Sequence, residues 1–223
     1  MANDYFRFKQ FTIRQSLCAM KVGTDGTLLG AWAKGGEQLL DVGTGTGLIA
    51  MMMAQRFPQA VVWGIDIDEG AVTQARQNVA ESVFADRISV VQRDFAEVLG
   101  EFDCLVSNPP YFVDSLSCPD AQRSMARHAD SLTYTSLMRH GWRLLSDNGE
   151  FSLIIPFDCK ARLESEAALA GFFKVRECAV RTTPAKPPRR YLLAFRKHPV
   201  PLECTELIIG SEAYHELTKD FYL

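Results

Sequence analysis

The chain has 223 residues, of which 47% are hydrophobic, and this size suits one domain built around a single sizeable core. Its formal net charge of -3, from 24 basic and 27 acidic residues, excludes nucleic-acid binding by bulk positive charge, so any such surface must be a local patch. No stretch approaches the roughly 20 apolar residues that cross a bilayer, and the N-terminus lacks a signal-peptide core. We therefore expect a cytoplasmic protein with no membrane association.

From Glu37 onward, short apolar runs alternate with amphipathic segments, a pattern typical of a parallel sheet covered by helices. The expected strands are, in chain order, 38–42, 60–67, 87–92, 102–108, 150–156, 173–182 and 189–197. The expected helices are 47–57, 70–83, about 132–145 and 159–169, with a turn at 147–149. The last two strands flank TPAKPP, which predicts an antiparallel hairpin. Residues 1–223 are thus expected to form a single α/β domain.

The segment before the first expected strand, residues 1–35, predicts an N-terminal extension that covers the ligand site. YFRFKQFTIRQ at 5–15 suits a small hairpin, and MKVGTDGTLLGAWA at 20–33 suits a helix. Either Thr24 or Asp25 can cap that helix, because both side chains accept backbone hydrogen bonds.

The glycine-rich stretch DVGTGTG, residues 41–47, lies between the first strand and the first helix of the sheet. Its glycines permit a tight turn and let a ligand approach the backbone closely. The third glycine comes one residue too early for G-x-G-x-x-G, which disfavours NAD or FAD. Asp66 ends the second strand, where a carboxylate can accept from both ribose hydroxyls. The glycine-rich stretch and Asp66 together favour a nucleoside ligand without a pyrophosphate.

Four motifs in this order carry a family resemblance: DVGTGTG, Asp66 in GIDID, Asp94 in VQRDF, and NPPY at 108–111. Together they resemble the class I S-adenosylmethionine-dependent methyltransferases of the N-methylating group, over nearly the whole chain. The resemblance implies a Rossmann-like fold with a mostly parallel seven-stranded sheet, S-adenosyl-L-methionine as cofactor and S-adenosyl-L-homocysteine as product.

The same resemblance implies the cofactor contacts. The methionine end would be surrounded by Asp41, Gly43, Gly45 and Gly47, with Thr24 and Asp25 on the covering helix. The nucleoside end would be held by Asp66 on the ribose, Ile67 on the adenine, Asp94 on the adenine amino group and Phe95 beside the ring. For Asp94 alone, a loop or helix-capping role is an equally good interpretation.

The stretch Asn108-Pro109-Pro110-Tyr111 forms the candidate catalytic site. The two prolines stiffen the backbone and remove two N–H donors, so the segment presents acceptors. The Asn108 side-chain oxygen and the Pro109 carbonyl suit the two N–H donors of a planar amine, and Tyr111 can stack on that group. An amide is no general base, so the expected mechanism is direct transfer driven by positioning. The alternative is a proline-rich turn that ends a strand.

An NPPY motif does not distinguish adenine from a glutamine side chain, since both offer a planar NH2. The flanking stretches QSLCAMKVGTDGTLLGAWA, NPPYF and ARH, and the overall length, are closely similar to the bacterial valine-tRNA adenine-N6 methyltransferases, which modify adenine 37. That resemblance implies tRNA as partner, with no obligate protein partner evident. A protein glutamine N5-methyltransferase and a non-catalytic RNA-binding protein of the same fold remain alternatives.

Basic side chains in two places are candidates for RNA contact. Arg127 and His128 lie in the long loop after Tyr111, which is either a functional lid or a solvated segment. Lys186, Arg189 and Arg190 lie in the C-terminal hairpin, where solvated strand-edge charge is the alternative. The histidines show no ligand spacing, so no metal is expected, and the dispersed cysteines predict reduced thiols.

Overall fold

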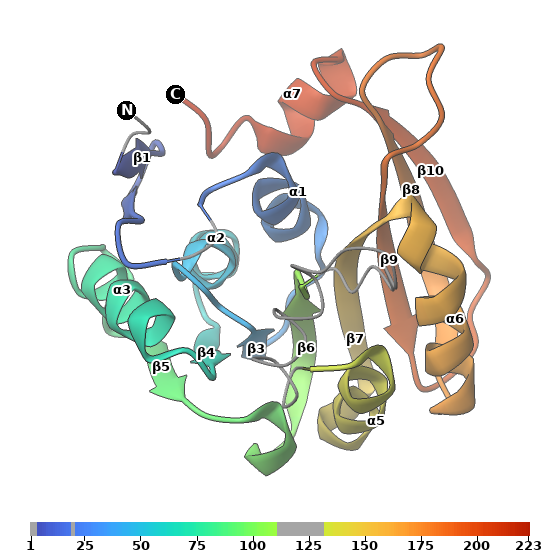
Figure 1. Cartoon of the computed structure of the whole chain (residues 1–223), viewed down its shortest axis with the longest axis horizontal. Helices are drawn as coiled ribbons and strands as arrows, with labels where there is room; N and C mark the ends of the chain where they lie inside the picture. The colour runs from blue at the N-terminus through green and yellow to red at the C-terminus, as the bar shows by residue number, and fades with distance from the viewer. Residues whose placement is uncertain (1–3, 19–20, 111–131) are drawn as a thin grey trace, which may run out of the picture.

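Parallel strands dominate the computed structural model, which describes residues 4–18, 21–110 and 132–223. Within these residues the main sheet has eight strands in the order β10-β8-β9-β7-β6-β3-β4-β5, and only β9 runs against its neighbours. The chain moves outward from β3 to β4 and β5, then returns to the other side of β3 with β6 (Figure 1). Such a reversal opens a crevice at the carboxyl ends of the strands, where open α/β sheets bind ligands.

The strands of the main sheet are β3 (Gln38–Val42), β4 (Val61–Asp66), β5 (Ile88–Gln92), β6 (Phe102–Ser107), β7 (Leu145–Pro156), β8 (Phe173–Arg181), β9 (Arg190–Arg196) and β10 (Glu203–Ile208). The α-helices are α1 (Thr24–Trp32), α2 (Leu48–Arg56), α3 (Glu69–Ala80), α5 (Tyr134–Leu144), α6 (Lys160–Leu169) and α7 (Glu212–Thr218). Two 3-10 turns, η1 (Phe95–Glu97) and η2 (Phe157–Cys159), complete the described elements of this part of the chain.

Helices cover both faces of the sheet, as the alternation in the sequence predicts. Figure 1 shows α1, α2 and α3 on one side and α5 and α6 on the other. Neighbouring strand residues divide between the two cores: Leu39 belongs to the core under α1 and α2, while Leu40 belongs to the core under α5 and α6. Burial of side chains on both faces explains why the strands read as continuous apolar runs.

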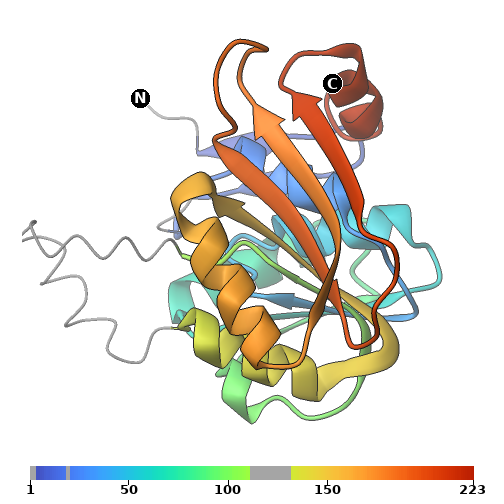
Figure 2. The same ribbon diagram turned by 90° about the vertical axis from the view of Figure 1, so that its right-hand side faces the viewer.

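The predicted hairpin at the C-terminal end is confirmed, because β8 and β9 pair antiparallel. The predicted count of seven strands is wrong, since β10 adds an eighth strand parallel to β8 at the edge of the sheet (Figure 2). The predicted turn at 147–149 is also wrong. These residues lie inside the strand β7, where the pairing with β6 shifts register between Phe102 and Cys104. A bulge therefore takes the place of the turn.

The N-terminal hairpin is confirmed as a separate two-stranded sheet, β1 (Tyr5–Arg7) with β2 (Thr12–Arg14). The C-terminal tail lies against it, because the Lys9 backbone N–H donates to the Phe221 carbonyl at 2.8 Å. Among the described residues, no helix has both the length and the apolar character that crossing a membrane requires.

Candidate active site

The glycine-rich loop between β3 and α2 forms one wall of the site. Gly43, Gly45 and Gly47 have φ values of 72°, 55° and 81°, a left-handed backbone that other residues rarely adopt. A Cβ added at Gly43 or Gly45 would meet nothing within 4 Å, so both face open space. The loop is fixed to the neighbouring strand, since the Gly43 and Thr44 N–H groups both donate to the Ile65 carbonyl at 2.9 Å. The loop thus presents bare backbone to a ligand.

Asp41 lies fully buried beneath this loop. Its Oδ2 accepts from the Thr44 hydroxyl at 2.7 Å and from the Ala50 N–H at 3.1 Å, which fixes the loop to the start of α2. Its Oδ1 is buried with no hydrogen-bond partner among the described residues. Burial raises the pKa of Asp41 to about 7, against the two hydrogen bonds that lower it. Asp41, predicted at the methionine end of the cofactor, therefore stabilises the loop from below and is not among the residues that line the pocket.

The end of β6 brings Asn108 to the same loop. β3 and β6 pair in parallel with Val42 opposite Ser107, and the Ser107 hydroxyl donates to the Val42 carbonyl at 2.9 Å. The next residue on each strand is therefore Gly43 and Asn108, and both line one pocket. Pro109 and Pro110 continue from Asn108, whereas the predicted stacking residue Tyr111 lies outside the described residues.

The pocket has a volume of about 300 Å³, and the N-terminal extension supplies its opposite wall. Its lining consists of residues 21–26, 43–46, 48, 49 and 108. Thr24 and Asp25 are among them, as predicted, but neither caps the helix: the N-cap is Gly23, without a side-chain hydrogen bond. The first turn of α1 faces the pocket instead.

Close packing holds α1 against α2. A Cβ at Gly30 would lie 2.8 Å from the Met52 sulfur, and one at Gly26 would lie 3.1 Å from Leu48. A side chain at Gly30 would therefore force Met52 to move, whereas one at Gly26 would press only on the end of Leu48. This contact sets the width of the pocket between the two helices.

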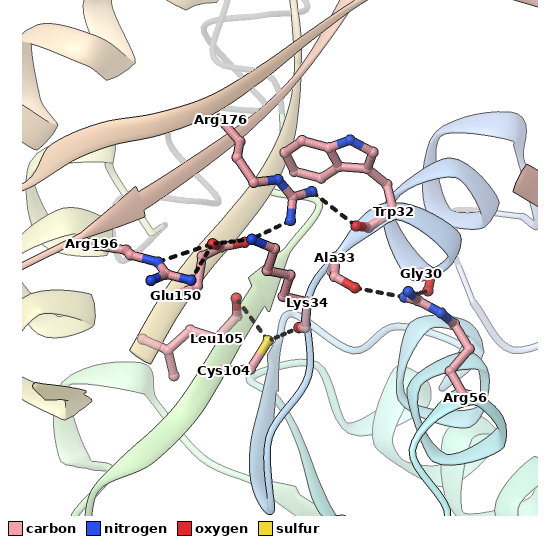
Figure 3. A network of polar contacts seen from close by, with 10 residues as sticks. All are labelled: Gly30, Trp32, Ala33, Lys34, Arg56, Cys104, Leu105, Glu150, Arg176 and Arg196. Atoms are coloured by element: carbon pink, nitrogen blue, oxygen red, sulfur yellow. Dashed lines mark hydrogen bonds and ion pairs between the residues drawn. The ribbon is translucent and has the colours of Figure 1, made fainter. Parts of the chain in front are cut away.

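A polar network shown in Figure 3 holds the other end of α1, where carbonyl groups lack helical partners. Arg56 donates to the carbonyls of Gly30 and Ala33 at 2.9 and 2.6 Å, and Arg176 donates to that of Trp32 at 3.0 Å. The Arg176 guanidinium also stacks on the Trp32 ring at 3.7 Å.

Glu150, which is 3% exposed, balances the charge in this network. It accepts from Arg176 at 3.0 Å and from Arg196 at 3.1 Å, while the Lys34 ammonium lies 3.9 Å away. A buried carboxylate persists only when paired and hydrogen-bonded in this way. The network therefore fixes the helix α1 to the strands β7, β8 and β9, and so fixes the pocket wall.

The predicted ribose ligand, Asp66, is built into the same loop. Its Oδ2 accepts from the Gly45 N–H at 2.9 Å, and its Oδ1 accepts from the Asp68 N–H at 3.0 Å. Each oxygen retains a second lone pair for a hydroxyl donor. Ile67 follows and is 52% exposed, which leaves an apolar surface beside the carboxylate.

The two residues predicted near the adenine behave differently. Asp94 caps the turn η1, accepting from the Ala96 N–H at 2.8 Å, which is the capping role that the sequence left open. Phe95 is 3% exposed and packs edge-on against His140, so little of its ring is available to a ligand. Ile67 is therefore exposed and Phe95 covered, and neither they nor Asp66 and Asp94 are among the residues that line the pocket.

The residues predicted to contact RNA differ in their surroundings. Lys186 and Arg189 are exposed on the β8–β9 connection. Arg190 is half-buried and its Nε donates to Asp25 Oδ2 at 2.7 Å, so it joins β9 to the pocket wall. Arg127 and His128 lie outside the described residues. Within the described part of the chain, no group of three or more His, Cys, Asp or Glu side chains could hold a metal ion.

Sequence reasoning missed three features of the site. The Arg190–Asp25 pair joins residues far apart in the chain, and the Glu150 network joins α1 to three strands. The third feature is Thr44, which lies between the motif glycines, lines the pocket and donates from its hydroxyl to Asp41. A hydroxyl three residues after a motif aspartate was a usable signal, whereas nothing in the sequence indicated the two long-range sets of ion pairs.

Comparison with known proteins gives consistent matches. The family model of the methyltransferase small domain matches residues 23–183. A tRNA1(Val) (adenine(37)-N6)-methyltransferase from Bacteroides thetaiotaomicron is 49% identical over 234 residues, which cover 100% of this chain and 99% of that protein. A protein of the same name from Phocaeicola vulgatus is 48% identical over 233 residues, with the same coverage.

Solved structures show the same fold. A predicted O-methyltransferase, Atu636 from Agrobacterium tumefaciens, has a TM-score of 0.69 at 19% identity and covers 88% of this chain and 96% of its own. TrmN from Thermus thermophilus has a TM-score of 0.56 at 23% identity, over 77% of this chain and 47% of its own.

The sheet order, the glycine loop and the pocket beside Asn108 define the class, a class I methyltransferase that uses S-adenosylmethionine. The matched domain and the identity over the full length then narrow this class. The chain belongs to the methyltransferase small domain family, and within it to the same family as these tRNA1(Val) (adenine(37)-N6)-methyltransferases.

Proposed function

We propose that this protein transfers a methyl group from S-adenosylmethionine to the exocyclic N6 of adenine 37 in valine tRNA, in the cytoplasm. The observation that supports the proposal is one pocket lined by both the glycine loop, the candidate cofactor site, and Asn108, the candidate amine-binding residue. The names of relatives 49% and 48% identical over the full length support the choice of tRNA over a protein glutamine.

The residues present fit the cofactor. Gly43 and Gly45 leave an open cradle, which Asp41 stabilises from below through Thr44 and Ala50. Asp66 offers both carboxylate oxygens to ribose hydroxyls while its other lone pairs hold the loop. When bound, S-adenosylmethionine supplies the electrophilic methyl group on its sulfonium.

The chain's own part in the reaction is to orient the amine. The Asn108 side-chain oxygen and the Pro109 carbonyl accept the two N–H hydrogens of N6, which reduces conjugation of the nitrogen lone pair with the ring. Neither group can take a proton, so catalysis depends on positioning and on fixed dipoles, and solvent takes the extra proton afterwards.

Labelled S-adenosylmethionine, offered with separate pools of tRNA and of protein, tests the proposal. We expect label in tRNA, recovered as N6-methyladenosine after nucleoside digestion, and none in protein. Label on a glutamine side chain would assign the protein-modifying alternative. Cofactor binding without transfer to either pool would assign the non-catalytic alternative.

A further inference from the structure

The N-terminal hairpin interleaves aromatic and basic side chains on one small surface. Residues 5–14 (YFRFKQFTIR) contain three cations and no acid, in a chain whose net charge is -3. Tyr5 is 51% exposed, and Phe6 is 36% exposed although its ring also packs edge-on against Tyr222. Arg7 and Lys9 are exposed beside them. Exposed rings next to cations are the features with which proteins bind unpaired bases and phosphates.

The hairpin also forms a hollow of about 520 Å³, lined by Tyr5, residues 7–12, Arg14 and Glu81. The charge within it is unbalanced. Arg14 pairs with Glu81 at 3.0 Å, whereas Arg7 has no acidic partner among the described residues. Lys9 donates to the neutral carbonyl of Lys219, which leaves its charge uncompensated. The hollow therefore favours an anionic occupant.

The hairpin is held firmly, as a preformed binding surface requires. Phe8 stacks on Tyr222 of the C-terminal tail, with 5.9 Å between the ring centroids. On the other side, the buried Asn78 amide donates to the carbonyls of Arg14 at 2.8 Å and of Thr46 at 2.9 Å. One side chain thus joins the hairpin to the glycine loop of the cofactor site.

Two further points connect this surface to substrate binding. The hairpin lies outside residues 23–183, the part matched by the common methyltransferase domain, so it is an addition to that domain. Lys21 at the pocket follows Arg14 by seven positions, and a chain of that length spans at most about 25 Å. Nucleotides advance by about 3.4 Å along one strand, so an RNA of at most roughly seven nucleotides is enough to bridge the two sites.

We propose that the hairpin surface is a second docking site for the tRNA substrate, in which Arg7 and Lys9 contact phosphate and Tyr5 stacks on an unpaired base. This inference rests on the proposed function, because it concerns the same RNA. The site holds the RNA while the target adenine occupies the pocket beside Asn108.

Single substitutions at Tyr5 and Arg7 test the site, with unmodified valine tRNA as the probe and the full chain as the protein. Tyr5→Ala should weaken tRNA binding about 10-fold, whereas Tyr5→Phe, which keeps the ring, should bind like the wild type. Arg7→Ala should lower the slope of log Kd against log salt by about one, and Arg7→Lys should not. Arg139→Glu, an exposed position on α5, serves as the control for charge alone.

The steady-state kinetics of the same variants should show an effect on tRNA binding and none on the chemical step. Because the hairpin touches neither the cofactor nor the reacting amine, Tyr5→Ala and Arg7→Ala should raise KM for tRNA and leave kcat and cofactor affinity nearly unchanged. If the wild type methylates tRNA but both variants keep its tRNA affinity and salt slope, the hairpin inference is overturned and the proposed function is not. A wild type that binds tRNA without methylating it would contradict the proposed function, while the same binding series still decides the hairpin's role.

Discussion

Replacement of Asp66 should weaken cofactor binding far more than it weakens turnover at saturating cofactor. The carboxylate fixes the loop through the N–H groups of Gly45 at 2.9 Å and Asp68 at 3.0 Å, and we propose that it also accepts from both ribose hydroxyls. Asp66→Ala removes all of these acceptors. Loss of the two charge-assisted ribose bonds corresponds to about 2–4 kcal/mol of binding free energy. The dissociation constant should therefore rise about 30- to 1,000-fold.

Isothermal titration calorimetry with S-adenosylmethionine measures this change, and a thermal unfolding curve checks that the variant is folded. Asp66→Asn keeps one acceptor oxygen and should lie between wild type and Asp66→Ala. Asp86→Ala, at an exposed acid in the loop before β5, should bind the cofactor like the wild type. A folded Asp66→Ala variant with unchanged affinity would refute the assignment of the ribose site to this carboxylate.

Three further predictions concern the amine, the loop and the RNA. Asn108→Ala should lower kcat about 100- to 1,000-fold and leave cofactor affinity nearly intact, so calorimetric loss of binding in step with activity would contradict its role. Burial raises the Asp41 pKa to about 7, so in the absence of ligand the contribution of Asp41 to the free energy of unfolding should fall as pH rises from about 4 to about 7. The thermal unfolding temperatures of the wild type and of Asp41→Asn should therefore diverge over this pH range. Unfolding temperatures that change with pH in the same way for both proteins would contradict the raised pKa. Lys186→Glu with Arg189→Glu should weaken tRNA binding and flatten its salt dependence, and an unaltered slope would remove the β8–β9 connection from the interface; Arg190 is left out because it pairs with Asp25.

Local patterns in the sequence predicted the sheet strands β3 to β9 and the glycine loop, because each depends on residues close together in the chain. The glycines at 43, 45 and 47 predicted a tight turn, and the structure shows that all three adopt the left-handed backbone that glycine permits. The strand β10 escaped prediction because four of its six residues are exposed, so it lacks the apolar run of a buried strand.

The ion pairs between residues far apart in the chain could not be predicted for a different reason. The Arg190–Asp25 ion pair depends on which strand lies beside α1, and the position of β9 between β7 and β8 is a property of the folded sheet. The acid Glu150 likewise reads as a surface residue until β8 and β9 place Arg176 and Arg196 around it. Residue type and spacing therefore predicted the chemistry of the candidate site and the helix that covers it, whereas the ion pairs that hold this helix are visible only in the fold.

The most direct test of the central claim is to locate the methyl group that this protein adds to RNA. Unmodified valine tRNA is incubated with the protein and S-adenosylmethionine, then digested to short oligonucleotides and analysed by mass spectrometry. The account predicts one added methyl group on the fragment that contains adenine 37, recovered as N6-methyladenosine, and none when adenine 37 is replaced by guanine. Methylation of that substituted tRNA at another nucleotide, or none in the unsubstituted tRNA while a protein pool is labelled, would contradict it.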